Sequence, residues 1–91
     1  MTITHDEKHQ QFTIVLPDGD EAELAYAKPA DDVISFTHTF VPENHRNHGL
    51  AEKLIKAGFA YAQENNLSVI PGCETVSKFL QAHPEYQKFL M

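Results

Sequence analysis

The apolar residues of this chain change their spacing near Pro42, and that change limits what the chain can fold into. Before it, apolar residues alternate with polar ones along 12–16 and 22–26, as on strands with one buried face. Residues 33–41 form a third run, rich in β-branched and aromatic side chains, which Pro42 ends. Residues 2–8 fit a short edge strand before these runs. The first half of the chain therefore predicts four strands.

The connections between these strands contain turn residues. Asp18-Gly19 lies between two alternating runs and predicts a hairpin with a tight primed turn, in which both central residues take positive φ. Residues 28–32 contain Pro29, and we expect a loop there. Strands that follow one another so closely in sequence are predicted to form an antiparallel meander.

After Pro42 the apolar residues follow the helical repeat instead. Their spacing predicts an amphipathic helix over 49–64 that ends at Asn65-Asn66. The apolar face of this helix is formed by Leu50, Leu54, Ala57 and Tyr61. A short buried strand is expected at 67–70, followed by a helical region from about residue 74 that pauses near His83-Pro84.

The resulting element order is β-β-β-β-α-β-α. We assign it to the α/β (α+β) class, with an antiparallel β-meander followed by a β-α-β crossover and C-terminal helices. With 91 residues the chain is expected to form a single domain over 1–91.

The charge and composition argue against several classes of protein. The formal charge of −6 argues against nucleic-acid binding, which needs a basic surface. The longest apolar stretches are far shorter than a membrane-spanning helix requires, and the polar residues 1–10 are unlike a secretory signal. The single cysteine, Cys73, leaves no internal disulfide and fits a reducing compartment, so we expect a cytoplasmic location.

The segment from Val41 to Ala51, which precedes the long helix, is the most informative part of the chain. A helix start presents backbone N–H groups without intrahelical partners and a partial positive charge, so it attracts anions. Gly49 and Ala51 let a phosphate group approach the backbone, and Arg46 supplies a planar charged fork for its oxygens. A solvated loop beside an ordinary glycine explains the same spacing about as well, so the spacing alone leaves both interpretations open.

Charged and metal-ligating residues are unevenly distributed. Positive character gathers around His45, Arg46, His48 and Lys53, whereas acidic residues dominate 18–32. We expect an anion to be drawn to the first segment and repelled by the second. Although the chain has six histidines, no Asp or Glu completes a ligand set at zinc spacing, and we predict no metal site.

The order of residues in this loop resembles a known motif. Arg46-x-x-Gly49-x-Ala51, after a strand and before an amphipathic helix, is similar to the Gln/Arg-x-x-Gly-x-Gly/Ala motif of the GNAT N-acetyltransferases. The resemblance covers residues 36–90 closely and the preceding strands by topology. The further residues that resemble compact GNAT-like proteins are Ala62, Asn66-Leu67-Ser68-Val69-Ile70-Pro71, Cys73, Val76, Phe79 and His83-Pro84-Glu85-Tyr86.

The resemblance implies a binding site for acetyl-CoA or coenzyme A. It implies a V-shaped split between the strands at 33–41 and 67–70, with pantetheine along the first strand and the thioester near Cys73. The pyrophosphate would lie over the backbone N–H groups of 48–51. The predicted cofactor-binding residues are Val41, Arg46, Asn47, His48, Gly49, Leu50 and Ala51.

Three residues are candidates for catalysis. Cys73 lies between a strand and a helix start, where a thiol pKa is lowered, and it is either an acyl carrier or a buried structural cysteine. Tyr86 either donates a proton to the departing CoA thiolate, as the resemblance implies, or packs on the sheet. His38 alternates with Phe36 and Phe40, which predicts one shared sheet face. There it is either a core histidine or a base near the acyl group.

We therefore expect an acetyl-CoA-dependent N-acetyltransferase that acts on an unidentified amine, by direct attack or through Cys73. A CoA-binding module without turnover is the alternative, and a small interaction domain is a third interpretation. Larger GNAT enzymes have helices between their first two strands, and residues 10–12 leave no room for them. The acceptor cleft is then open or completed by a partner, such as a second copy in a homodimer.

Overall fold

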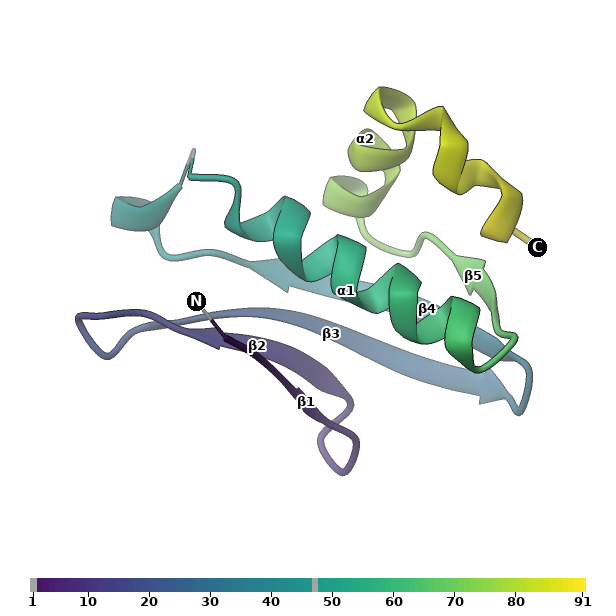
Figure 1. Cartoon of the computed structure of the whole chain (residues 1–91), viewed down its shortest axis with the longest axis horizontal. Helices are drawn as coiled ribbons and strands as arrows, with labels where there is room; N and C mark the ends of the chain where they lie inside the picture. Colours follow the sequence, from purple (N-terminus) through teal and green to yellow (C-terminus); the bar gives the residue numbers. More distant parts are fainter. Residues whose placement is uncertain (1, 47) are drawn as a thin grey trace.

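A five-stranded sheet with the strand order β1-β2-β3-β4-β5 forms the framework of the chain (Figure 1). The structure is a computed structural model and describes residues 2–46 and 48–91. Its elements are β1 (Ile3–Asp6), β2 (Gln11–Val15), β3 (Glu21–Ala30), β4 (Val33–Phe40), the 3-10 helix η1 (Glu43–His45), α1 (Leu50–Glu64), β5 (Ser68–Ile70), α2 (Glu74–Ala82) and the 3-10 helix η2 (Pro84–Phe89). β1 to β4 pair antiparallel, and β5 pairs parallel to β4. The predicted meander and β-α-β crossover are confirmed.

The helices pack together on one face of the sheet. α1 lies across β2, β3 and β4, and α2 and η2 pack beside it (Figure 1). Gly58 allows α1 to approach closely, because a Cβ there would lie 2.8 Å from the ring of Phe36 and 3.1 Å from the side chain of Leu24. We call the other face of the sheet the open face, since no helix of the described residues covers it.

The β2–β3 hairpin forms where the Asp-Gly pair predicts it, but its turn differs from the prediction. The Gly19 N–H donates to the Leu16 carbonyl at 2.9 Å, and the Leu16 N–H donates to the Asp20 carbonyl at 2.7 Å. Gly19 has φ of 91°, whereas Asp18 is not among the residues with positive φ. Because Pro17 fixes φ at the first turn position, the chain makes a three-residue loop that ends in a left-handed glycine. The predicted primed turn is therefore wrong.

The loop predicted at 28–32 is also wrong. β3 continues to Ala30, and only Asp31 and Asp32 separate it from β4. The β3–β4 register shifts between Ala27 and Ala30, in the stretch that contains Pro29. A proline cannot donate a hydrogen bond to a neighbouring strand, and an irregular end of a ladder tolerates it without ending the strand.

A β-bulge interrupts the pairing of β4 with β3. Ala25 pairs with His38 and Tyr26 pairs with Phe36, so Thr37 is an extra residue on β4. A bulge inserts one residue into one strand and changes the direction of the side chains that follow it. The alternation of β4 is therefore different before and after Thr37.

The bulge corrects the prediction that Phe36, His38 and Phe40 share one face. Phe36 is fully buried under the helices, whereas His38 is exposed and Phe40 is 43% exposed on the open face. Thr39 and Val41 point to the helix side instead, where Thr39 contacts Cys73 and Val41 packs against the core. His38 is therefore not a core histidine.

β4 and β5 pair only along the first part of β4. Their register runs from Val33 with Ser68 to Ser35 with Ile70. β4 continues to Phe40, whereas β5 ends at Ile70 and the chain turns at Gly72 towards α2. The second half of β4 thus extends beyond its pairing with β5, on the side where the resemblance places a split.

β1 brings an aromatic cluster to the helix side of the sheet. The His5 ring stacks on Phe12 with 4.2 Å between centroids, and Tyr61 of α1 meets it edge-on at 4.5 Å. His5 Nε2 lies 2.6 Å from the Tyr26 hydroxyl oxygen. Burial lowers the pKa of His5, although nearby carboxylates act in the opposite direction. Burial also raises the pKa of Tyr26 to about 12, so its hydroxyl keeps its proton.

The stability of the fold is expected to decrease as the pH falls below 6.5, the ordinary pKa of histidine. Because the folded chain lowers the pKa of His5, the unfolded chain binds more protons in this range and is favoured. The contribution of His5 is complete above 6.5 and is lost as the pH approaches its folded-state pKa. Urea unfolding between about pH 5 and about pH 8 measures this slope. A His5→Phe variant keeps the ring on Phe12 and should show a flatter profile, whereas equal slopes in both chains would contradict the prediction.

Candidate functional site

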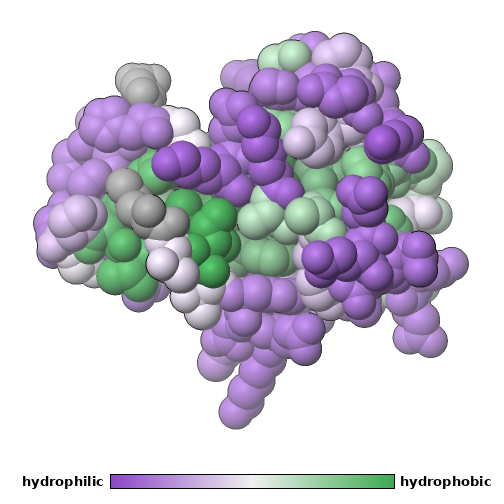
Figure 2. Space-filling view, in the orientation of Figure 1, coloured by the Kyte–Doolittle hydropathy of each residue, from purple (hydrophilic) through white to green (hydrophobic). Residues whose placement is uncertain are grey.

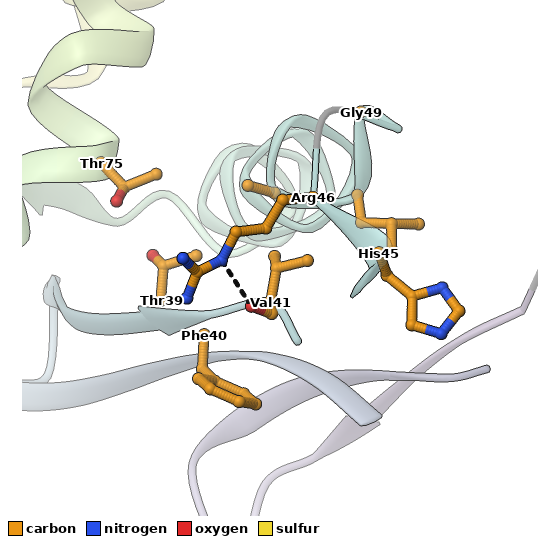
Figure 3. Close-up of a pocket in the computed structure, with 9 residues that line it drawn as sticks. Thr39, Phe40, Val41, His45, Arg46, Gly49 and Thr75 are labelled. Carbon is orange, nitrogen blue, oxygen red and sulfur yellow. Dashed lines mark hydrogen bonds between the residues drawn. The ribbon is translucent and has the colours of Figure 1, made fainter. Parts of the chain in front are cut away.

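A pocket of about 390 Å³ opens where the end of β4, the loop before α1 and the start of α2 meet. This volume lies within the range of small-molecule sites. Figure 3 shows Arg46 reaching from the loop across the end of β4, with Thr75 of α2 on the far side. The lining residues are Thr39, Phe40, Val41, His45, Arg46, Gly49, Leu50, Ala51 and Thr75. They include five of the seven predicted cofactor-binding residues.

The start of α1 has the geometry of an anion site. Gly49 is the residue before the helix and has φ of 75°, a left-handed conformation that favours glycine. A Cβ at Gly49 would meet nothing within 4 Å, so the space in front of its backbone is open. No side chain of the described residues caps the helix, and the Lys53 N–H donates to the Gly49 carbonyl at 3.1 Å. The backbone N–H groups of the helix residues before Lys53 therefore have no acceptor within the helix.

Arg46 holds a cationic fork over the end of β4. Its Nε donates a hydrogen bond to the Val41 carbonyl oxygen at 3.1 Å, which fixes the guanidinium beside the strand (Figure 3). In the part of the chain that the structure describes, no carboxylate forms an ion pair with Arg46. The terminal nitrogens of the guanidinium therefore remain suited to phosphate oxygens.

His45 lines the same pocket but turns its ring away from Arg46 (Figure 3). Its Nε2 lies 2.7 Å from a carboxylate oxygen of Asp18 in the β2–β3 turn. The hydrogen bond with His45 lowers the pKa of Asp18. Asp18, Asp20 and His45 bring their ligand atoms within 4.8 Å of one another. The predicted separation of acidic residues from the positive segment is therefore wrong for the folded chain, because the β2–β3 turn places Asp18 beside His45.

Cys73 lies immediately before α2 and beside the pocket. Its sulfur is 3.4 Å from the Thr39 hydroxyl oxygen, and Thr39 lines the pocket. Partial burial raises the pKa of the Cys73 thiol, but the Thr39 hydroxyl and the backbone N–H groups of Thr75 and Val76 outweigh this effect. The net result is a pKa below the ordinary thiol value, as expected for a sulfur at a helix start. The sulfur lies near these N–H groups, but it does not form a hydrogen bond that caps α2.

The other predicted site residues lie elsewhere. His48 is exposed and does not line the pocket, and Asn47 lies outside the described residues. His38 is exposed on the open face. Tyr86 packs among aromatic rings of α1, α2 and η2, with its centroid 5.2 Å from Phe59 and 5.1 Å from Phe79. Neither His38 nor Tyr86 borders the pocket. The catalytic roles predicted for these two residues stay predictions.

Thr39, Phe40 and Thr75 line the pocket and were not predicted. Thr39 reaches it because the bulge turns its side chain to the helix side, and no residue pattern in the sequence signals that bulge. Thr75 lies two residues after Cys73, in the first turn of α2, so a threonine close to a candidate thiol at a helix start was a usable signal.

The chain is similar to a family of known enzymes and to proteins of its own size. A family model described as GCN5-related N-acetyl-transferase matches residues 11–89. Protein NATD1 from Danio rerio is 33% identical over 89 residues, which cover 94% of this chain and 81% of the relative. Protein NATD1 from Homo sapiens is 30% identical over 83 residues, which cover 90% of this chain and 74% of the relative.

A solved structure has the same fold over nearly the whole chain. It is an NMR structure of a GCN5-like protein from Staphylococcus aureus, with a TM-score of 0.78 and 28% sequence identity. The match covers 99% of this chain and 87% of the other.

Within the described residues, every helix is too short or too polar to cross a bilayer. Figure 2 shows its most strongly apolar surface at the left of the view, beside the β2–β3 hairpin.

Proposed function

This chain belongs to the GCN5-related N-acetyltransferase family, and from that premise we propose that it transfers an acetyl group from acetyl-CoA to an amine. The observation that carries the proposal is the pocket at the start of α1, where Arg46, Gly49 and Ala51 meet the end of β4. Three features of this pocket suit a diphosphate. The start of α1 is uncapped, the space before Gly49 is open, and the Arg46 guanidinium has no acidic partner among the described residues.

The second half of β4 is suited to the pantetheine arm. It extends beyond its pairing with β5, and Thr39 and Val41 of this stretch line the pocket. Backbone groups along an unpaired strand edge bind an extended, amide-containing chain in the way that another strand would. The arm would then lead from the pyrophosphate site towards Cys73.

Cys73 is the residue that we assign to the acyl group. Its lowered pKa increases the thiolate fraction, and the Thr39 hydroxyl fixes the sulfur beside the pocket. In this route the thiolate bonds to the acetyl carbonyl carbon, the bond from that carbon to the CoA sulfur breaks, and CoA leaves as a thiolate. The acceptor amine then attacks the Cys73 thioester and regenerates the thiol. Direct attack of the amine on acetyl-CoA is the alternative route and needs no protein nucleophile.

Binding of CoA is tested by thermal unfolding with and without the ligand. A ligand present at about 100 times its dissociation constant adds about 2.7 kcal/mol to the free energy of unfolding, so the midpoint should rise by about 10–20 °C. No shift at saturating CoA or acetyl-CoA would exclude both an acetyltransferase and a CoA-binding module.

The acyl route is tested by intact mass measurement after incubation with acetyl-CoA. The wild-type chain should gain the mass of an acetyl group, and Cys73→Ala should lose this adduct while it keeps the thermal stabilisation by CoA. An adduct that forms equally well in Cys73→Ala would show that Cys73 is not the carrier. CoA binding without adduct or acetylated product would favour the alternative function, a CoA-binding module without turnover. The positions of His38 and Tyr86 away from the pocket are the observation in favour of that alternative.

A further inference from the structure

The open face of the sheet carries an acidic and apolar patch, which we define as Val15, Glu21, Glu23 and Phe40. Val15 pairs directly with Glu21 across β2 and β3, and Glu23 pairs directly with Phe40 across β3 and β4. Val15 is 58% exposed and Phe40 is 43% exposed. Apart from Met91, they are the exposed large hydrophobic residues of the described chain. Two carboxylates therefore lie between two accessible apolar side chains on one face of the sheet.

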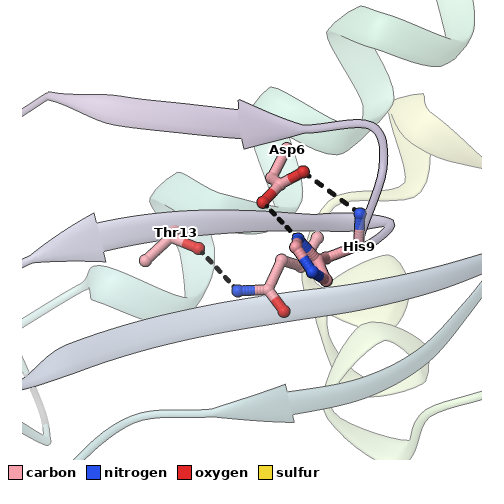
Figure 4. A network of polar contacts seen from close by, with 4 residues as sticks. Asp6, His9 and Thr13 are labelled. Atoms are coloured by element: carbon pink, nitrogen blue, oxygen red, sulfur yellow. Dashed lines mark hydrogen bonds and ion pairs between the residues drawn. The ribbon is translucent and has the colours of Figure 1, made fainter.

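Carboxylates predominate among the charged groups of this face. Asp6 lies on the same side of the sheet, and its carboxylate accepts a hydrogen bond from the His9 backbone N–H at 3.1 Å and lies 2.7 Å from the His9 ring (Figure 4, in which the helices lie behind the strands). Glu21 and Glu23 form no ion pair within the described residues. Of the seven Lys and Arg residues, Lys28 lies in the second half of β3, five residues after Glu23, and the others lie in loops or on helices, namely Lys8, Arg46, Lys53, Lys56, Lys78 and Lys88. The patch thus attracts cations.

The patch is continuous with the pocket. Phe40 belongs to the open face, and it also lines the pocket with Thr39 and Arg46 (Figure 3). The free edge of β4 therefore connects the helix side, where the thioester is proposed to lie, with the acidic face. A group held against Glu23 and Phe40 has a short path to that edge.

We propose that the open-face patch holds the acceptor, and that the acceptor is a lysine side chain in an extended basic peptide segment. The patch crosses three strands, and of its four residues only Phe40 lines the pocket. Sites for small molecules are concave. The aliphatic stem of a lysine packs on Val15 or Phe40 while its ammonium faces Glu21 or Glu23, and the Phe40 ring also attracts the cation. This inference rests on the proposed acetyl transfer.

The transfer is chemically balanced with such an acceptor. The lysine ammonium first loses a proton to solvent, and the neutral nitrogen forms a bond to the carbonyl carbon of the acetyl thioester. The bond from that carbon to sulfur breaks, and the departing thiolate takes up the second proton from the nitrogen. The products are an acetylated lysine and a free thiol.

The binding of a short peptide of alternating lysine and glycine, titrated into the full chain without CoA, tests the inference. Amide NMR shifts should concentrate in residues 13–25 and 36–41. Glu21→Gln combined with Glu23→Gln should weaken binding about three- to tenfold at low salt, the amount expected from two exposed charge contacts. Asp31→Asn with Asp32→Asn removes the same charge from the turn at the other end of β3 and should change the affinity less than twofold by the same estimate.

Equal weakening in both double variants would show attraction to the overall negative charge and would overturn the proposal. Spermidine binding as tightly as the peptide would also overturn it, because a small polyamine would then be the better occupant. A dimer in sedimentation experiments, with patch signals that depend on protein concentration, would identify a second copy of the chain as the occupant. Thermal stabilisation by CoA is measured separately, so a failure of this inference is distinguishable from a failure of the proposed function.

Discussion

Phe36→Ala is expected to lower the free energy of unfolding by about 3–5 kcal/mol, the usual cost of removing a buried phenylalanine ring. Phe36 is fully buried and its centroid lies 5.6 Å from that of Phe59. Gly58 leaves just enough space for its ring, so α1 has no side chain at that point with which to fill the cavity. A chain of 91 residues has a small core, and this loss is a large part of its total stability.

Phe40→Ala provides the matched control, since it removes the same ring from the same strand. Phe40 is 43% exposed on the open face, and we expect a loss of about 1 kcal/mol or less. Urea unfolding of both variants measures the difference. Similar losses would show that the bulge at Thr37 does not separate the two side chains in solution.

Arg46→Glu is expected to weaken CoA binding by about 10- to 100-fold at low salt, because it removes a charge-assisted contact and adds repulsion. Arg46 lines the pocket, and its Nε is fixed to the Val41 carbonyl. The effect should be smaller at high salt, since mobile ions screen the repulsion between the introduced carboxylate and the phosphates of CoA. Titration calorimetry at two salt concentrations measures both effects.

Lys53→Glu is the control for Arg46→Glu, because it makes the same change in net charge. Lys53 is exposed on α1 and does not line the pocket. We expect its effect on the affinity to be less than about threefold, as for an exposed charge outside the site. If both variants bind CoA as the wild type does, Arg46 does not contact the ligand. If both weaken binding equally, the long-range field of the chain accounts for the effect.

The order of the elements was predictable from the sequence because it depends on local periodicity. The helical spacing of Leu50, Leu54 and Tyr61 identifies α1, and the alternation along 12–16 and 22–26 identifies two strands. Gly49 was also recognisable, although the structure adds a second reason for it. Its φ of 75° favours glycine whether or not a ligand is bound.

Features that depend on contacts between distant residues were not predictable in this way. Asp18 reaches His45 only after the β2–β3 hairpin has folded, and the two residues are 27 positions apart. The face of His38 depends on where β3 and β4 lose their register, which propensity does not reveal. Cys73 and Thr39 likewise meet because the β-α-β crossover returns the chain beside β4.

The bulge at Thr37, rather than the identity of its side chain, is what the pocket requires. Thr37 is exposed, so many side chains would be tolerated there without loss of packing. If Thr37 were paired in a regular ladder without the bulge, every side chain after it would change sides. Thr39 would leave Cys73, and Phe40 would be forced under the helices. In related chains, substitutions at this position should therefore be common, and a chain that lacks this residue needs no bulge to keep Thr39 and Phe40 on their present sides.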